Sequence, residues 1–127
     1  MGAVRNDTAQ AEAGGIFAAE LRRELSARGR LEPEGSAAPE LDAELVAMSS
    51  LPTGLGAEGG ATSYRLDAQL RIRAGDYQDV VTGGEEYLTG VDVLGTEANR
   101  RAALRRLAQA LAAEAIERYE VNERFGK

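Results

Sequence analysis

The sequence predicts an α+β fold: a two-layer sandwich in which two helices pack on one face of a four-stranded mixed sheet, in the order β-α-β-β-β-α. Two observations support this. Residues 63–73 alternate apolar and polar side chains over eleven positions, which is typical of a half-buried strand. Segments 10–28 and 96–120 instead place apolar residues three and four positions apart, as amphipathic helices do. With 127 residues, the chain is expected to form a single domain over 1–127.

The N-terminal half is predicted to hold a short strand at 3–5, a helix over 10–28 and a second strand over 41–50. Gly29 fits the C-terminal stop of the helix. The helix carries its apolar side chains at Ala13, Ile16, Phe17, Leu21 and Leu25. In the strand over 41–50, Leu41, Ala43, Leu45 and Ala47 share one side. Because a helix connects the two strands, they should be parallel if they share a sheet.

The C-terminal half is predicted to contain a hairpin and a long helix. Residues 63–73 form its first strand, Ala74–Asp76 the turn, and residues 77–88 the return strand. The Gly83-Gly84 pair in the return strand indicates a bulge or a close approach of another backbone. The last helix is expected over 96–120, with Thr96 as its N-cap.

The composition argues against several classes of function. The net charge of −6 and the pI of about 4.8 disfavour a general nucleic-acid binder, which needs a basic surface. The chain has no Cys and no His, so zinc sites built from these residues and catalytic triads that use histidine are excluded. The adjacent Glu85 and Glu86 point to opposite faces of a strand, so they form no catalytic pair. We predict neither a catalytic residue, a cofactor nor a metal, and therefore no enzyme.

One short motif invites a different interpretation. Gly54-Leu-Gly56-Ala-Glu-Gly59 fits the G-x-G-x-x-G pattern of a dinucleotide-binding turn. Such a turn must lead directly into a helix, whose N-terminal amides hold the pyrophosphate. The predicted strand over 63–73 follows instead. We therefore interpret Thr53–Gly60 as a flexible connection between two antiparallel strands.

The arginines of the predicted strand are the candidate ligand-binding residues. Arg65, Arg71 and Arg73 share its polar face, and arginines so placed can hold a phosphorylated or acidic ligand through bidentate contacts. The alternative is ordinary surface charge that nearby acids neutralise. The acids in question are Asp67, Asp76 and Asp79.

The last helix has an unusual charge order. Its first half carries basic residues and its second half acidic ones, which opposes the helix macrodipole. The residues are Arg100, Arg101, Arg105 and Arg106, followed by Glu114, Glu117 and Glu120. A partner surface would explain this order, and so would a solvated face that tolerates a small penalty.

Two stretches resemble the LptE family of lipopolysaccharide-assembly lipoproteins. In the first, AVRNDTAQAEAGGIFAAELRRELSARGRL, a polar N-x-T-type stretch leads into a helix of the F-x-x-x-L-R-x-E-L type. These positions are Asn6, Thr8, Phe17, Leu21, Arg22, Glu24 and Leu25. In the second, GGEEYLTGVDVLGTEANRRAALRRLAQALAAEAIERY, a final strand leads into E-x-x-R-x-x-A-L-x-x-L. These positions are Glu97, Arg100 or Arg101, Ala103, Leu104 and Leu107.

The resemblance implies a non-enzymatic lipoprotein of the outer membrane, on its periplasmic face. Such proteins plug the LptD β-barrel, and the two together place lipopolysaccharide in the outer leaflet. The family's signal peptide and lipidated cysteine are missing from this sequence. A soluble, N-terminally truncated form would explain that, and so would a cytosolic relative. In the truncated form, the link to the membrane is a lipid anchor that lies outside this sequence.

The resemblance also indicates which ligand the arginines would bind, because lipopolysaccharide carries phosphates and acidic sugars. We expect Arg65, Arg71 and Arg73 to be the lipopolysaccharide-binding residues, and charge reversal at Arg71 and Arg73 should weaken binding. The alternative function is a periplasmic lipoprotein that activates or accompanies another envelope machine, such as a cell-wall synthase or a lipid transporter. A small nucleotide-binding module is disfavoured because no helix follows Gly59.

Overall fold

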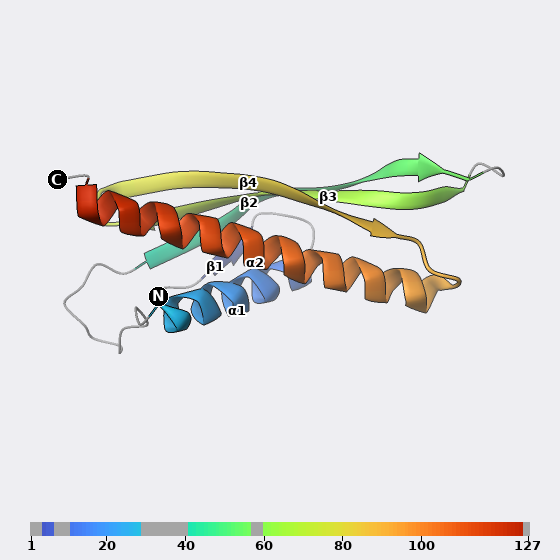
Figure 1. Ribbon diagram of the computed structural model, residues 1–127, viewed down its shortest axis with the longest axis horizontal. Coiled ribbons are helices and arrows are strands. Elements are labelled where there is room, and N and C mark those ends of the chain that lie inside the picture. Colours follow the sequence, from blue (N-terminus) through green and yellow to red (C-terminus); the bar gives the residue numbers. More distant parts are fainter. Residues whose placement is uncertain (1–3, 7–10, 29–40, 57–59, 126–127) are drawn as a thin grey trace.

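The computed structural model describes residues 4–6, 11–28, 41–56 and 60–125. These residues form an elongated molecule in which a long helix runs beside long strands (Figure 1). The elements are β1 (Val4–Asn6), α1 (Ala11–Ala27), β2 (Leu41–Leu55), β3 (Ala61–Ala74), β4 (Tyr77–Leu88) and α2 (Val93–Phe125).

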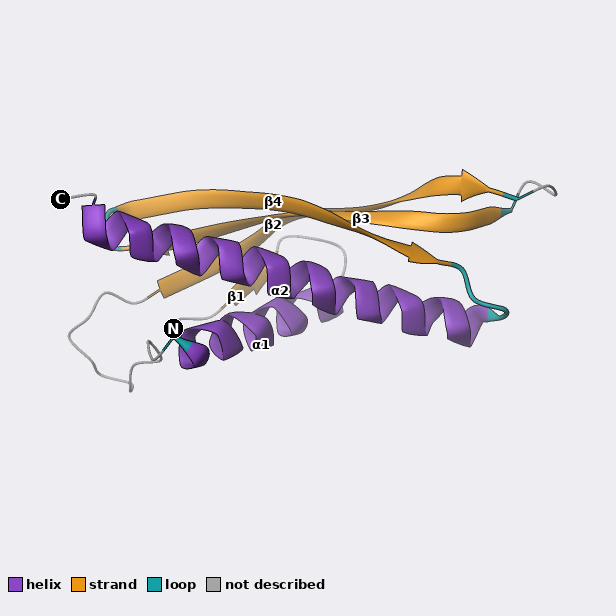
Figure 2. Ribbon diagram, viewed as in Figure 1, coloured by secondary structure: helices purple, strands orange, loops and turns teal. Residues whose placement is uncertain are grey.

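The sheet has the strand order β1-β2-β3-β4. Its three long strands, β2, β3 and β4, pair antiparallel, and the three-residue β1 adds a short parallel pairing to β2 at one edge. Both helices lie on the same face of the sheet (Figure 2). The predicted α+β class with two helices on one face is confirmed, and the sheet is dominated by its antiparallel part.

The core lies between the sheet and the helices. Its largest fully buried side chains come from α1, the three long strands and α2: Phe17, Leu21, Leu45, Leu66, Leu70, Ile72, Val81, Leu104, Leu107, Leu111 and Ile116. In α1, Ala13, Phe17, Leu21 and Leu25 are buried and Ile16 is partly buried, as the helical spacing predicted. None of the described helices has a stretch long and apolar enough to cross a membrane.

Strand β2 departs from the prediction in two ways. It continues through Pro52 and Gly54 to Leu55, five residues beyond the predicted end at Ser50. Proline is tolerated there because, among the described strands, none pairs with the other edge of β2 beyond Leu45. A register shift between Leu45 and Ala47 also reverses the alternation, so Ala47 is exposed and Met48 packs against the core instead.

The connection between β2 and β3 is therefore shorter than the predicted loop. It consists of residues 56–60, and the Gly56 amide donates to the Gly60 carbonyl at 2.7 Å. We expected Thr53–Gly60 to be flexible, and part of this stretch, residues 57–59, lies outside the described residues. The next turn follows the prediction, and Gly75 adopts the left-handed backbone conformation there, with a φ of 60°.

The Gly83-Gly84 pair produces no bulge, because β3 and β4 pair in regular register along their whole length. It instead permits a close approach. A Cβ atom at Gly83 would lie 3.0 Å from Leu111 Cδ2 of α2. The approaching atoms belong to leucine side chains, so neither the bulge nor the close backbone approach that the sequence indicated is observed at Gly83.

Helix α2 begins earlier than predicted, because Asp92 rather than Thr96 is its N-cap. The Asp92 carboxylate accepts from the Gly95 amide at 2.7 Å, which satisfies one of the first free N–H groups of the helix. The Thr96 hydroxyl donates to the Asp92 carbonyl at 3.1 Å and accepts from the Gly90 amide at 2.9 Å. Thr96 therefore braces the connection from β4 into the helix.

Candidate binding surface

The sheet face opposite the helices carries the three arginines that we predicted to bind a ligand. We call this surface the outer face. Arg65, Arg71 and Arg73 lie on one side of β3, and the alternate residues Leu66, Ala68, Leu70 and Ile72 point into the core. Arg65 and Arg71 are six residues apart, which places them about 20 Å from each other along the strand. The structure therefore brings Arg71 and Arg73 together and separates Arg65 from them.

Arg65 is engaged within the protein. Its Nε donates to Asp67 Oδ1 at 2.9 Å, so its charge is largely neutralised on the surface. The pair lies directly over Gly84 of β4, where a side chain would collide with both residues. Arg65 is thus the arginine least suited to hold an anionic ligand.

Arg71 and Arg73 differ in their surroundings. Arg71 Nη1 lies 2.8 Å from Glu44 Oε1 of β2, and its Nε is buried without a hydrogen-bond partner among the described residues. Arg73 is exposed and forms no ion pair with the part of the chain that the structure describes, although Asp42 stands opposite it in register. Arg73 is the candidate whose charge remains available.

A shallow hollow of about 470 Å³ lies on the outer face between Arg65 and the middle of the sheet. Small side chains flank it on β2 and β4. Its lining includes Ala47, Ser49, Asp67, Gln69 and Thr82. Sequence reasoning missed this hollow, because the register shift after Leu45 is what turns Ala47 and Ser49 towards this face.

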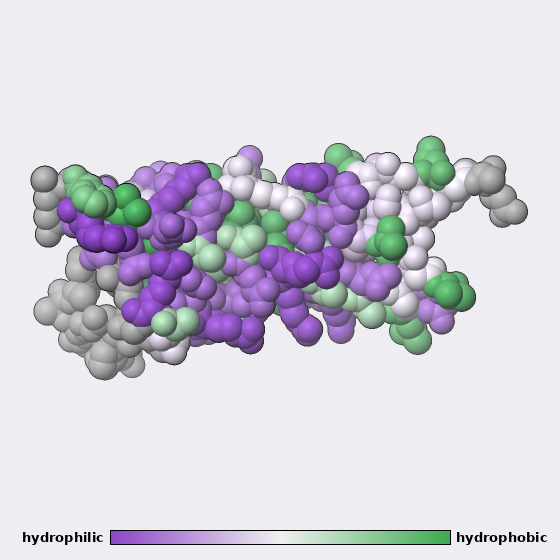
Figure 3. All heavy atoms as spheres, viewed as in Figure 1, coloured by the Kyte–Doolittle hydropathy of each residue, from purple (hydrophilic) through white to green (hydrophobic). Residues whose placement is uncertain are grey.

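At one end of the molecule, exposed aliphatic side chains gather where β2, β4 and the start of α2 meet. Towards the right-hand end of Figure 3 several green residues lie among white ones, whereas purple hydrophilic residues are most frequent in the middle. We call this surface the apolar end. It consists of Leu51, Leu55, Leu88, Val91, Val93 and Leu94, each at least 60% exposed.

The opposite end holds a polar network between β4 and α2. Tyr77 donates to Asp79 at 3.1 Å, and Arg118 lies 3.3 Å from the same carboxylate and 2.6 Å from Glu114. Burial and the hydrogen bond to Asp79 raise the pKa of Tyr77 to about 12. Burial alone would raise the pKa of Asp79. Hydrogen bonds from the Val80 amide, Tyr77 and Arg118 outweigh that effect, so this pKa is lowered.

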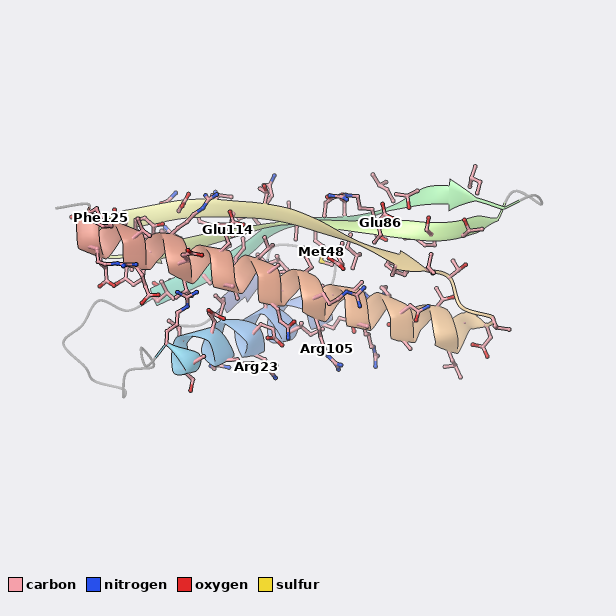
Figure 4. All side chains as sticks on the ribbon, in the orientation of Figure 1. Arg23, Met48, Glu86, Arg105, Glu114 and Phe125 are labelled. Carbon is pink, nitrogen blue, oxygen red and sulfur yellow. The ribbon has the colours of Figure 1, made fainter. Side chains whose placement is uncertain are left out.

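The adjacent acids of β4, Glu85 and Glu86, do not face each other. Glu85 pairs with Arg106 of α2 at 2.7 Å, and Glu86 lies on the other side of β4 (Figure 4). Among the described residues, no three acids come together in a way that would hold a metal ion.

Charged residues near both ends of α2 pair with residues of opposite charge in α1 or directly after it. Near the start of α2, Arg100 bonds to Glu12 of α1, and Arg101 lies 3.8 Å from the same carboxylate group. Near its end, Glu120 accepts from Arg28, which directly follows α1, at 2.5 Å. The sequence pattern showed the unusual order but could not reveal that the first helix lies alongside.

Comparison with known proteins gives this arrangement a family. Residues 1–119 match the family LptE, described as lipopolysaccharide-assembly. The fold resembles rare lipoprotein B from Shewanella oneidensis, with a TM-score of 0.61 and 13% identity over 96% of this chain and 97% of that one. A minor lipoprotein from Acinetobacter baumannii gives a TM-score of 0.55 and 13% identity over 94% and 90%. No match is found among curated proteins. The family match covers nearly the whole sequence, so the chain belongs to the LptE family of lipopolysaccharide-assembly proteins.

Proposed function

We propose that this chain is a non-enzymatic outer-membrane lipoprotein that plugs an LptD-type β-barrel and binds lipopolysaccharide there. The observation that carries the proposal is the family match over residues 1–119. In this proposal a lipid anchor outside the present sequence holds the protein at the periplasmic face of the membrane.

The shape and the surface support the role of a plug. The 33 residues of α2 correspond to a length of about 50 Å. Between its two ends the molecule is covered by paired charges, among them Arg65–Asp67, Arg71–Glu44 and Arg106–Glu85. A polar, charge-balanced side fits the lumen of an outer-membrane barrel, which is also polar.

The phosphate groups of lipopolysaccharide are assigned to Arg73 in this proposal, with Arg71 beside it. Arg73 forms no ion pair among the described residues, although Asp42 stands opposite it, whereas Arg65 is held by Asp67. A guanidinium that is exposed and unpaired can offer both of its N–H edges to a phosphate.

Purification from outer membranes tests the barrel partnership. The full-length lipoprotein, affinity-tagged, should recover a large β-barrel protein after detergent extraction. Recovery of a cell-wall synthase or a lipid transporter in its place would contradict the proposal and favour the alternative function, an accessory to another envelope machine.

Charge reversal tests the lipid contact. Arg73→Glu, alone and with Arg71→Glu, should weaken lipopolysaccharide binding in vitro at moderate salt. The matched control is Arg105→Glu, because Arg105 is an exposed arginine on the side of α2 away from the sheet (Figure 4) and forms no ion pair with described residues. Equal binding by all variants would exclude Arg71 and Arg73 as ligands.

A further inference from the structure

The apolar end is the largest gathering of exposed aliphatic side chains in the described part of the molecule. It holds six of the nine large hydrophobic residues that are exposed there. Val91 and Val93 are 107% and 83% exposed, so they contribute nothing to the core. Solvent contact of this much aliphatic surface is unfavourable, and a concentration of it marks a site of interaction.

The same end is almost free of charge. Residues 49–64 and 87–96 contain only two charged residues, Glu58 and Asp92, and no basic one. Asp92 is already used as the N-cap of α2, where its carboxylate accepts from the Gly95 amide. Glu58 lies outside the described residues.

Hydrogen bonds between neighbouring strands fix the backbone that carries these aliphatic side chains. The Thr89 amide donates to the Thr62 carbonyl at 3.1 Å, which joins the end of β4 to the start of β3. The Thr53 and Ser63 hydroxyls lie 2.8 Å apart, which joins β2 to β3. These bonds hold Leu51, Leu55 and Leu88 at one end of the sheet as a preformed surface.

The lack of charge restricts what this surface can bind. An anionic head group requires available cations, and the nearest one, Arg65 opposite Leu51 in register, is held by Asp67. The lumen of a barrel is polar, so it offers little to a cluster of leucines and valines. Hydrocarbon is the complementary surface, because its transfer from water onto aliphatic side chains is favourable and needs no polar partner.

We propose that the apolar end binds the acyl chains of a lipid. It is a separate subsite from Arg73, since Ser63 and Arg73 are ten positions apart on β3, a span of about 33 Å. The inference rests on the proposed lipopolysaccharide function and assigns head group and acyl chains to different ends of the molecule.

Polar substitutions at exposed positions test this subsite. The variant Leu55→Ser, Leu88→Ser, Val93→Ser leaves the core intact, because these side chains are 73%, 67% and 83% exposed. The control variant Val121→Ser, Phe125→Ser removes exposed apolar groups from the other end of the molecule. Equal unfolding temperatures for both variants and the unmodified chain establish that folding is unaffected.

Three probes separate acyl chains from head group: lipopolysaccharide, fully deacylated lipopolysaccharide, and dodecyl maltoside below its micellar concentration. The apolar-end variant should bind lipopolysaccharide and dodecyl maltoside at least about tenfold more weakly, since each exposed aliphatic group contributes to burial. It should bind deacylated lipopolysaccharide unchanged, and the control variant should bind all three probes as the unmodified chain does.

The failures of the two proposals are distinguishable. If the apolar-end variant binds acylated lipopolysaccharide as well as the unmodified chain does, the acyl subsite is wrong and the proposed function stands. If that variant instead loses the co-purified barrel while keeping its lipid affinity, the surface is a protein contact and the inference is overturned. If the unmodified chain binds dodecyl maltoside at this end but no lipopolysaccharide, the subsite stands and the proposed lipid function fails.

Discussion

Arg28 and Glu120 lie 92 positions apart in the sequence, yet Arg28 Nη1 lies 2.5 Å from Glu120 Oε1. At the other end of the helix pair, Arg100 of α2 bonds to Glu12 of α1. The first helix therefore runs parallel to the second. At the start of the pair, α1 supplies the acid and α2 the base, and at the end the residue after α1 supplies the base and α2 the acid. Contacts of opposite sign at both ends fix the register of the two helices and offset the unfavourable macrodipole order of α2.

The Arg28–Glu120 contact should be measurable as a coupling between the two helices. Arg28→Gln and Glu120→Gln are each expected to destabilise the fold, and the double variant by less than their sum. We expect a coupling of about 0.5–1 kcal/mol, because both side chains are only partly shielded from solvent. Urea denaturation of the four proteins gives this value.

Arg23→Gln is the matched control for this cycle. Arg23 is 70% exposed and lies 3.6 Å from Glu20 within the same helix, so its loss should change the free energy of unfolding by less than about 0.5 kcal/mol. A coupling of zero between Arg28 and Glu120 would mean that apolar packing alone sets the helix register.

Local patterns predicted the elements whose signals are local. The strand over 77–88 was predicted with its observed bounds, because a turn signal precedes it and makes it the return strand of a hairpin. The buried stripe of α1 followed from its spacing alone. The bulge after Leu45 and the passage of β2 through Pro52 could not be predicted, since both depend on which neighbouring strand is present.

The candidate site was only partly predictable for a similar reason. Alternation placed Arg65, Arg71 and Arg73 on one face, but their availability depends on Asp67 and Glu44, and Glu44 is supplied by another strand. The apolar end draws on two stretches that are far apart in the sequence, residues 51–55 and 88–94, so no single stretch revealed it. Exposure, which decides whether Leu88 is core or surface, is a property of the assembled fold.

The two neighbouring glycines of β4 should differ in their tolerance of a side chain. A Cβ atom at Gly83 would meet Leu111 Cδ2 at 3.0 Å and Leu107 Cδ1 at 3.6 Å. Gly83→Val should therefore push α2 away from the sheet and cost about 2–3 kcal/mol in the free energy of unfolding. Thermal or urea denaturation measures this cost.

Gly84→Ala is the comparison, because a Cβ atom there meets only the ends of the Arg65 and Asp67 side chains. These groups can move into solvent, so we expect a cost below about 1 kcal/mol. Equal destabilisation by the two substitutions would show that backbone propensity, and not the approach of the helix, selects glycine at both positions.

Tyr77 should make folding stability depend on alkaline pH. Its pKa is raised to about 12 in the folded protein, whereas an unfolded tyrosine titrates near 10. The folded state thus holds the phenolic proton more tightly, and this stabilisation is complete below about pH 10 and lost as the pH rises towards 12. Tyr77→Phe should remove the tyrosinate absorbance that appears near pH 12. If the substitution leaves that part of the titration curve unchanged, the proton belongs to another tyrosine.

Asp79 should make folding stability depend on acidic pH, and its stabilising contribution should be lost as the pH falls. Its pKa is lowered in the folded protein, so its contribution is present above the unfolded value of about 3.9 and is lost as the pH falls below it. Asp79→Asn should reduce the loss of stability on acidification below about pH 4. Denaturation curves of both proteins at pH 3 and pH 7 test this, with Asp76→Asn as the control at an exposed carboxyl in the adjacent turn.

The free edge of β4 is protected by side chains, and removing them should promote self-association. Asn99 donates to the Leu88 carbonyl at 2.8 Å and Arg106 to the Glu86 carbonyl at 3.4 Å, both on the side of β4 away from β3. An unprotected strand edge can pair with a second chain. The double variant Asn99→Ala, Arg106→Ala should therefore form oligomers that sedimentation velocity detects at concentrations where the unmodified chain is monodisperse.

The control is the double variant Arg105→Ala, Gln109→Ala, which removes exposed groups from α2 that touch no β4 carbonyl. Oligomers in that control as well would trace the association to the helix surface and leave the strand edge without a role.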